Sequence, residues 1–348
     1  MKNFKIGNFE IGENSPCFII AEAGSNHDRD MGQAKEMIDV AVEAGADAVK
    51  FQTFTADKIA ANTSHPIMKL GNEYEGVPTL YELYKGLELP REWQRELKEY
   101  ADKKGIIFLS TPFDYDAVEE LEELGMEAYK IASFEMVDIP FLRYIAKKNK
   151  PIILSTGMAN LGEIEDALNA IYEQGNNQVI LLHCGISYPM PVGEVNLAAM
   201  DTMKSAFQLP VGYSDHTLGI AIPIAAVARG AKVIEKHFTL DRNLKGPDHK
   251  FAIEPDELKA MVKGIRDAEK AIGSSIKGLA HTERLHHQRG RRSIFAKMDI
   301  PKGTIITEDM LAVLRPGVGL MPKYFDIVVG REARKDIKKN EPITWEVI

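Results

Sequence analysis

The chain has 348 residues, of which 43 are basic and 51 acidic, so its formal net charge is −8 with histidine neutral. Hydrophobic residues make up 45% and charged residues 27%, which is ordinary for a soluble globular protein of one large or two smaller domains. The acidic balance argues against a nucleic-acid binder or a membrane-surface protein, and two cysteines are too few for a disulfide scaffold.

No segment predicts secretion or membrane insertion. The first ten residues, MKNFKIGNFE, lack the apolar stretch of a signal peptide. The longest apolar run, 219–228, is about half of the roughly 20 residues that span a bilayer. Together with the low cysteine content, this pattern predicts a cytoplasmic protein that binds neither membrane nor nucleic acid.

Short apolar, β-branched runs alternate with longer amphipathic stretches along most of the chain. The predicted strands are 17–21, 46–51, 106–110, 128–131, 151–155, 178–183, 210–212 and 232–236. The predicted helices are 33–44, 91–103, 115–124, 139–147, 162–174, 196–207, 218–228 and 255–272. Several of these helices stop at a glycine just before the next strand, which fits the preference for glycine after a helix C-terminus.

Eight strand–helix units predict an α/β fold, a (β/α)8 TIM barrel over residues 1–275. A doubly wound open sheet uses the same unit, but no G-x-G-x-x-G motif follows the first strand. Residues 276–290 are polar and predict a linker. Residues 291–348 carry short apolar runs broken by proline and glycine, which predicts a small, mostly β domain. A domain of fewer than about 60 residues has only a marginal core unless it packs against a partner.

Polar residues follow every predicted strand, at the end where TIM barrels carry their catalytic groups. They are Glu22, Asn26 and His27; Lys50 and Gln52; Ser110 and Thr111; Lys130, Ser133 and Glu135; Ser155; His183 and Tyr188; Ser214, Asp215 and His216; and Glu235, Lys236 and His237. One such residue is common at a solvated strand end or a helix N-cap. Eight endings in phase predict a single functional mouth.

The residue types at these ends indicate a chemistry. Lys50 and Lys130 are cations that suit a phosphate or a carboxylate. Four hydroxyl groups would add donors: Thr111, Ser133, Ser155 and Ser214. His216 and His237 could hold a divalent metal with open positions. Four carboxylates would serve proton transfer or sugar hydroxyls: Glu22, Glu135, Asp215 and Asp248. The set predicts a carbon–carbon bond-forming enzyme that acts on a phosphorylated compound and a sugar.

Nine segments together resemble the sialic acid synthase family, the phosphoenolpyruvate-dependent synthases of nine-carbon sugar acids such as N-acetylneuraminic, pseudaminic and legionaminic acid. They are FIIAEAGSNH at 18–27, GADAVKFQTF at 45–54, STPFD at 110–114, YKIASFE at 129–135, ILSTGMA at 153–159, GYSDHT at 212–217, EKHFTLD at 235–241, KGPDHKFAIEPDEL at 245–258 and VLRPGVGLMP at 313–322. They occur in the expected order from about residue 5 to the end.

The resemblance implies a TIM barrel followed by a small antifreeze-like (SAF) domain. It implies a domain-swapped homodimer in which each C-terminal domain caps the partner's barrel. It also implies a transferase that condenses phosphoenolpyruvate with an N-acetylated hexosamine in its open-chain aldehyde form and releases phosphate. The acceptor is N-acetylmannosamine, the commonest in the family, or a diacetamido-trideoxyhexose as in the pseudaminic, legionaminic and spore-coat polysaccharide branches.

The resemblance also implies roles for individual residues. The phosphoenolpyruvate set is Lys50, Thr111, Lys130, Ser133, Ser155 and Ser214. His216 and His237 would bind Mn2+ or Mg2+, and Glu135 would stabilise charge or take a proton. Glu22 would act on the sugar side. The other sugar contacts would be Gln52, Phe113, Tyr188, Asp248 and, from the partner subunit, Arg315.

One position departs from the family pattern. Ile186 stands where relatives often carry serine or asparagine, and an apolar residue there suits a deoxygenated sugar. Two other functions stay open on the residues alone. One is an aldolase that forms a Schiff base on Lys130. The other is a non-catalytic protein that binds carbohydrate or ice through the C-terminal module.

Overall fold

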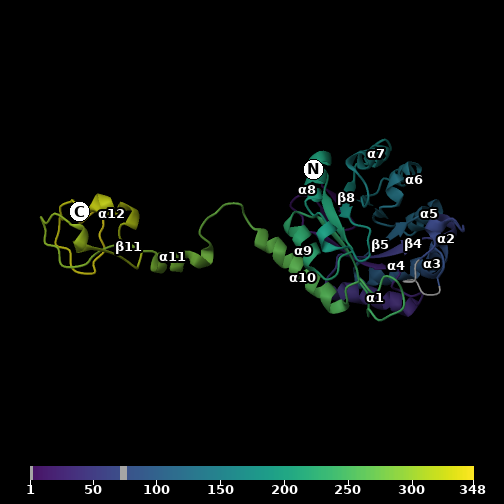
Figure 1. Ribbon diagram of the computed structural model, residues 1–348, viewed down its shortest axis with the longest axis horizontal. Coiled ribbons are helices and arrows are strands. Elements are labelled where there is room, and N and C mark those ends of the chain that lie inside the picture. The colour runs from purple at the N-terminus through teal and green to yellow at the C-terminus, as the bar shows by residue number, and fades with distance from the viewer. Residues whose placement is uncertain (1–2, 71–76) are drawn as a thin grey trace. The chain divides into compact units, whose positions relative to one another are not determined.

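The computed structural model describes residues 3–70 and 77–348. The chain divides into two compact units, Met1–Gly273 and Ser274–Ile348. Figure 1 draws the first in purple to green and the second in green to yellow. Within the described residues, no helix is both long enough and apolar enough to cross a membrane.

The first unit is a barrel of eight parallel strands. Their order is β5-β4-β3-β10-β9-β8-β7-β6, and β5 and β6, at the two ends of this order, lie beside each other. The strands are β3 Phe18–Gly24, β4 Ala48–Thr53, β5 Ile107–Pro112, β6 Tyr129–Ile131, β7 Ile152–Ser155, β8 Val179–Cys184, β9 Val211–Asp215 and β10 Val233–His237. This confirms the predicted TIM barrel. It excludes the doubly wound sheet, in which the two edge strands would lie far apart.

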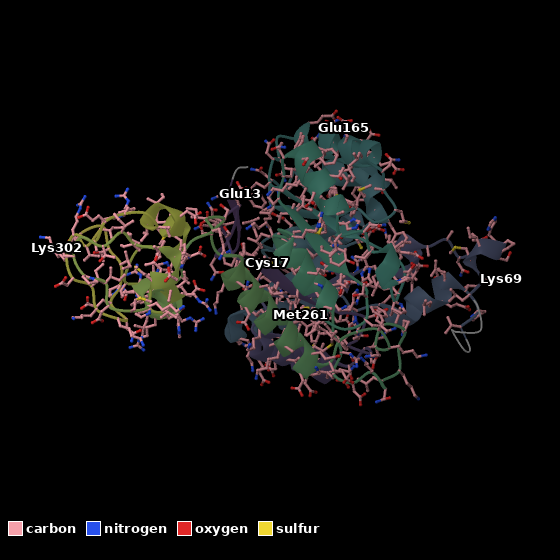
Figure 2. All side chains as sticks on the ribbon, turned by 60° about the vertical axis from the view of Figure 1, so that its left-hand side comes forward. Glu13, Cys17, Lys69, Glu165, Met261 and Lys302 are labelled. Carbon is pink, nitrogen blue, oxygen red and sulfur yellow. The ribbon has the colours of Figure 1, made fainter. Side chains whose placement is uncertain are left out.

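Helices surround these strands (Figure 1). They are α1 Met31–Ala44, α4 Trp93–Lys104, α5 Tyr115–Glu123, α6 Ile139–Ala146, α7 Leu161–Tyr172, α8 Ala199–Phe207, α9 Ala221–Ala228 and α10 Pro255–Ile272. Short polar side chains cap several of them: the Asp30 carboxylate accepts from the backbone of Gln33 at the start of α1, and Gly45 ends that helix at φ 80°. Figure 2 shows Glu165 of α7 and Lys302 of the second unit among the surface side chains.

Two regions have elements that the sequence did not predict. The N-terminal strands β1 (Phe4–Ile6) and β2 (Phe9–Ile11) form an antiparallel hairpin. Its residues Ile6 and Ile11 are buried against the first residues of the barrel strands, so the hairpin closes the N-terminal end of the barrel. Between β4 and α4 the described residues form α2 (Ala56–Ile59), η1 (Pro66–Met68) and α3 (Leu80–Leu87).

The second unit has its own small core around two antiparallel strands, β11 (Ser293–Ala296) and β12 (Leu311–Leu314). The core residues include Ile294, Ile306, Leu311, Val328, Ile337 and Ile343. Its short helical elements are η4 His281–Glu283, α11 Arg284–Gly290, η5 Glu308–Met310, η6 Pro322–Tyr324 and α12 Phe325–Val328. The segment expected to be a linker is therefore helical from residue 281 onward, where the Glu283 carboxylate caps the backbone of Ala280.

Candidate active site

The inner face of the barrel changes character along each strand. Alternate residues of a strand point inward, and near the N-terminal end these residues are apolar: Phe18, Ile20, Ala48, Leu109, Ala128, Ile153, Ile180, Leu182 and Val233. The next inward position is a cysteine on β8, Cys184, and is polar on the other seven strands: Glu22, Lys50, Thr111, Lys130, Ser155, Ser214 and Glu235. Strand periodicity alone therefore brings residues that are far apart in sequence to one end of the barrel.

A small pocket of about 60 Å³ opens at this end. Its lining contains nine of the predicted site residues: Glu22, Gln52, Lys130, Ser133, Ser155, Tyr188, Ser214, His216 and His237. It also contains residues that were given no role in catalysis or binding: Ala132, Phe134, Cys184 and Glu235, together with Ile186. Lys50 and Thr111 lie directly behind the lining, since Lys50 Nζ is 2.9 Å from the Thr111 hydroxyl and 2.9 Å from the Glu22 carboxylate.

The two predicted cations are both paired with buried carboxylates. Lys50 contacts Glu22 at 2.9 Å and Glu235 at 3.7 Å. Lys130 lies 3.5 Å from the other oxygen of Glu235 and donates to the Ser155 hydroxyl at 2.8 Å. The sequence predicted both cations and carboxylates at this end of the barrel, and the structure adds that the two lysines are paired with two glutamates. Such buried pairs carry a desolvation cost that favours a specific role over mere stability.

Burial shifts the protonation of this cluster. It raises the pKa of Glu22 to about 7, although Lys50 nearby draws it down. Burial opposes ionisation of Glu235 too, but Lys130 and Lys50 bring the pKa of that carboxyl below its usual range. The pKa of Lys130 is lowered, since burial outweighs the attraction of Glu235. Near neutral pH the cluster therefore holds an ionised Glu235 and a Glu22 close to half protonated.

The two histidines predicted to bind a metal face the same pocket, with ring centroids 5.4 Å apart. His216 Nδ1 lies 2.5 Å from the backbone oxygen of Gly185, which can only accept, so Nδ1 carries the proton and Nε2 keeps a lone pair. Burial lowers the pKa of His216 to about 4 and that of His237 well below its usual value. Both rings are therefore neutral at neutral pH, the form that coordinates metals.

His237 also has a ring nitrogen that could bind a metal. Its Nδ1 is buried without a hydrogen-bond partner among the described residues, and the nearest carboxylate, Asp248, is 3.7 Å away. No group of three or more histidine, cysteine, aspartate or glutamate residues in the described ranges could enclose a metal ion. The arrangement fits a divalent cation that takes two imidazoles from the protein and leaves its other positions for substrate or water.

One side of the pocket is partly apolar. The centroid of the Tyr188 ring lies 4.1 Å from that of His216, with the rings tilted, and 5.2 Å from that of Phe251, in an edge-to-face contact. Ile186 presses on Gly157, where an added Cβ would come within 2.6 Å of the isoleucine side chain and 2.8 Å of the Ser133 hydroxyl. A glycine is thus needed at 157 for the strand-end loops to meet. Gln52 donates to Glu22 at 2.8 Å, which places its amide at the same rim.

The remaining predicted residues lie at different distances from the pocket. Glu135 starts η2 (Glu135–Val137), and burial raises its pKa to about 7. Asp248 accepts from the Ser25 hydroxyl at 3.2 Å beside His237. The Phe113 ring packs 5.6 Å from Phe54 and is not part of the pocket lining. Arg315 follows β12 in the second unit with an exposed side chain.

Glu235 is the main charged residue of the pocket that sequence reasoning did not assign. It was noted as a polar strand end, yet its role needs the register that sets it between Lys50 and Lys130. The sequence did hold a clue: Glu235 lies two residues before His237 on the same strand, so both side chains point to the same face. Cys184 was interpreted as a small apolar residue. It lines the pocket 3.8 Å from His216 Nδ1, and burial raises the pKa of its thiol to about 11.

Known proteins show the same two-part organisation. Residues 37–277 match the NeuB family, and residues 291–348 match the SAF domain. The N,N'-diacetyllegionaminic acid synthase of Campylobacter jejuni is 46% identical over 331 residues, which cover 93% of this chain and 98% of that protein. The pseudaminic acid synthase of the same species is 39% identical over 334 residues, 96% of each chain.

A solved structure agrees with these relatives. The N-acetylneuraminic acid (sialic acid) synthetase of Leptospira borgpetersenii superposes with a TM-score of 0.73 at 38% identity, covering 82% of this chain and 95% of that one. The inward polar layer of the barrel, the two-part chain and these full-length matches lead to one assignment. The chain belongs to the NeuB family, and the relatives that it resembles are synthases of sialic, legionaminic and pseudaminic acids.

Proposed function

We propose that this protein condenses phosphoenolpyruvate with an N-acetylated hexosamine, in its open-chain aldehyde form, to a nine-carbon 2-keto sugar acid and phosphate. One observation carries the proposal: Lys130, Ser155 and their neighbours, side chains that suit a phosphate, share one pocket with two neutral imidazoles. An anion and a polarised carbonyl can therefore meet within a few ångströms.

The lysines and hydroxyls bind and orient the enol ester. Lys130 and Ser155 already form a charge-assisted hydrogen bond, and Ser133 and Ser214 open onto the same space. A phosphate would compete with Glu235 for Lys130 and with Glu22 for Lys50. Protonation of Glu22 favours this exchange, because the cluster then carries one net positive charge. The protein thus holds its cations ready without leaving them unpaired in the free state.

The reaction balances with water as third reactant. C3 of phosphoenolpyruvate attacks the aldehyde carbon, and the new alkoxide takes a proton to become a hydroxyl group. Cationic character at C2 is captured by water, which gives up a proton, and the C2–O bond to phosphate then breaks to leave the ketone. We assign these proton transfers to Glu22, which lines the pocket, and to Glu135, whose buried carboxyl has a raised pKa. A metal on His216 and His237, Mn2+ or Mg2+, would supply Lewis-acid polarisation of the aldehyde.

For the acceptor we propose a diacetamido-trideoxyhexose over N-acetylmannosamine. Ile186 lines the pocket where a hydroxyl-bearing sugar would want a polar partner. The 46% identity to a diacetyllegionaminic acid synthase agrees with this choice. Gln52, Tyr188 and Asp248 are the proposed sugar contacts around it. The second unit contributes Arg315.

The partner is a second copy of this chain. Exposed apolar side chains lie on the loops after β6, β7, β8 and β9, at the same end of the barrel as the pocket: Phe134, Met158, Tyr188, Val192 and Leu218. The second unit also exposes apolar residues around Arg315, namely Leu314, Val318 and Met321. Surfaces of this kind usually mark an interface. A swapped homodimer would cover both and bring Arg315 of one chain to the acyl group of a sugar in the other barrel.

Phosphate release from phosphoenolpyruvate, measured with a panel of acetamido sugars in the presence of Mn2+ and then of EDTA, tests the reaction. We expect release that depends on both the sugar and the metal. No release with any sugar would contradict the proposal. Pyruvate with borohydride separates the aldolase alternative, since the lowered pKa of Lys130 also suits a Schiff base. A trapped adduct would favour the aldolase.

The swapped dimer has its own test. Arg315→Ala and His237→Ala chains, each impaired alone, should recover part of the activity when mixed, because one hybrid pocket then has both residues intact. No recovery on mixing would contradict the contribution in trans.

A further inference from the structure

A set of hydrogen bonds outside the pocket joins the loop after β3 to the segment after β10. His249 is fully buried, and its Nε2 lies 2.9 Å from the Asp28 carboxylate while its Nδ1 lies 2.6 Å from the Thr239 hydroxyl. A carboxylate only accepts, so Nε2 donates to Asp28. With both ring nitrogens bonded, the imidazole cannot rotate. No step of the proposed reaction uses this set.

The backbone near Asp28 and His249 adopts conformations with positive φ that bring the two side chains together. Asp28 and Arg29 both have positive φ, 48° and 56°, which costs free energy for residues other than glycine. Across from them, Gly246 has φ 154°, and a Cβ there would come within 2.9 Å of the His249 ring and 3.2 Å of the Asp28 carboxylate. The loop after β3 thus pays a conformational cost, and the segment after β10 requires a glycine at 246, for Asp28 and His249 to meet.

The bonded set adjoins the reacting groups on both loops. Asp248, next to His249, accepts from the Ser25 hydroxyl at 3.2 Å and faces His237 Nδ1 at 3.7 Å. Gly24, at φ 55°, lies beside both His237 and Asp248: a Cβ at this position would come within 3.2 Å of the His237 ring and 3.3 Å of the Asp248 carboxylate. A small shift of either loop would therefore move Asp248 relative to His237.

We propose that Asp28, His249 and Thr239 form a latch that fixes Asp248 in front of His237 and so sets the acceptor side of the pocket. All three are positioning residues, and none lines the pocket. The inference rests on the proposed function in one respect, namely that Asp248 contacts the sugar. It deepens that function by naming what holds this contact in place.

Steady-state kinetics with separate variation of the two substrates test the latch. Asp28→Ala should raise the acceptor KM about tenfold and leave the phosphoenolpyruvate KM within twofold, because only the acceptor side moves. Asp28→Asn keeps an oxygen for the His249 N–H and should restore most of the loss. The matched control is Asp30→Ala, which removes the α1 cap from the same loop without touching His249. Equal KM values for Asp28→Ala and wild type would overturn the proposal.

A double-mutant cycle shows whether Asp28 acts through Asp248. In an Asp248→Ala background, Asp28→Ala should add no further rise in acceptor KM, since the group that the latch positions is gone. Effects that multiply in full would contradict the latch. A Gln33→Ala control accounts for the other bond to Asp28, from the Gln33 amide at 3.1 Å.

Hydrogen exchange gives a readout that needs no substrate, so failure of the latch and failure of the proposed reaction can be told apart. In the free protein, Asp28→Ala should speed exchange in the peptide over residues 246–253, whereas Asp30→Ala should speed it only at the start of α1. Unchanged exchange over 246–253 would overturn the latch even if the wild type proved active. A wild type without activity but with this exchange pattern would contradict only the proposed reaction.

Discussion

The two halves of the barrel interior use the same strands for opposite purposes. Toward the N-terminal end of the barrel, inward residues such as Ile20 and Ile153 pack with the hairpin into an apolar layer. Two residues further along the strands, Glu22 and Ser155 belong to a layer of buried charges and hydroxyls. The first layer lowers the free energy of the fold through apolar burial, and the second adds a desolvation cost to it. The comparison indicates that the polar layer is kept for chemistry, supported by the apolar layer below it.

The largest expected effect comes from removing one of the two proposed metal ligands in the polar layer. His237→Ala should lower turnover by about 1000-fold, because several kcal/mol of carbonyl polarisation would be lost. Circular dichroism and the thermal midpoint should stay close to wild type, since the removed ring is polar and lies at the pocket. Full activity in this variant would remove the metal assignment.

The apolar layer should respond in the opposite way. Ile153→Ala leaves a cavity in a fully buried layer and should lower the free energy of unfolding by about 2 to 5 kcal/mol. Urea denaturation measures this loss. The phosphoenolpyruvate KM, taken well below the melting temperature, should stay within twofold of wild type. A large change in KM with unchanged stability would reverse the roles assigned to the two layers.

The next inward position on the same strand, two residues further along, sharpens the contrast. Ser155→Ala removes the hydroxyl that accepts from Lys130 at 2.8 Å, so the phosphoenolpyruvate KM should rise about 10- to 100-fold. The control is Thr156→Ala, because the Thr156 hydroxyl donates to the backbone oxygen of Leu182 and lies beside Met203 of α8. Thr156→Ala should keep the wild-type KM, and an equal rise in both variants would contradict a specific role for Ser155.

The smallest predicted effect is a pH dependence. Burial raises the pKa of Glu135 to about 7, so its carboxylate form prevails only above that pH. If the carboxylate accepts a proton, kcat should fall about tenfold per pH unit as the pH drops below 7. Glu135→Gln should be slower but flat across this range. A wild-type profile that rises toward acid would contradict a basic role.

Strand and helix positions in the barrel could be predicted because buried parallel strands read as continuous apolar runs between amphipathic helices. The hairpin of β1 and β2 was missed since three-residue strands are too short for alternation to show. In the site, Lys130 and His216 were recognisable as polar strand ends. The pairing of both lysines with Glu235 was not, because it depends on the register of strands far apart in the sequence.

Packing also explains the remaining gaps. His249 reads in the sequence as one more histidine, and only the fold brings it to Asp28, 221 residues away. Phe113 follows a strand like the other predicted residues, yet its ring turns to Phe54. Strand endings therefore identify the pocket as a whole more reliably than they place each side chain within it.

The most direct test of the account follows the oxygen that bridges C2 and phosphorus in phosphoenolpyruvate. With this oxygen labelled as 18O, and with a diacetamido-trideoxyhexose and Mn2+ present, the label should appear in the released phosphate, because the C2–O bond breaks after water has added to C2. Mass spectrometry of the phosphate and of the sugar acid measures it. Label retained in the sugar acid, or no phosphate released at all, would contradict the central claim.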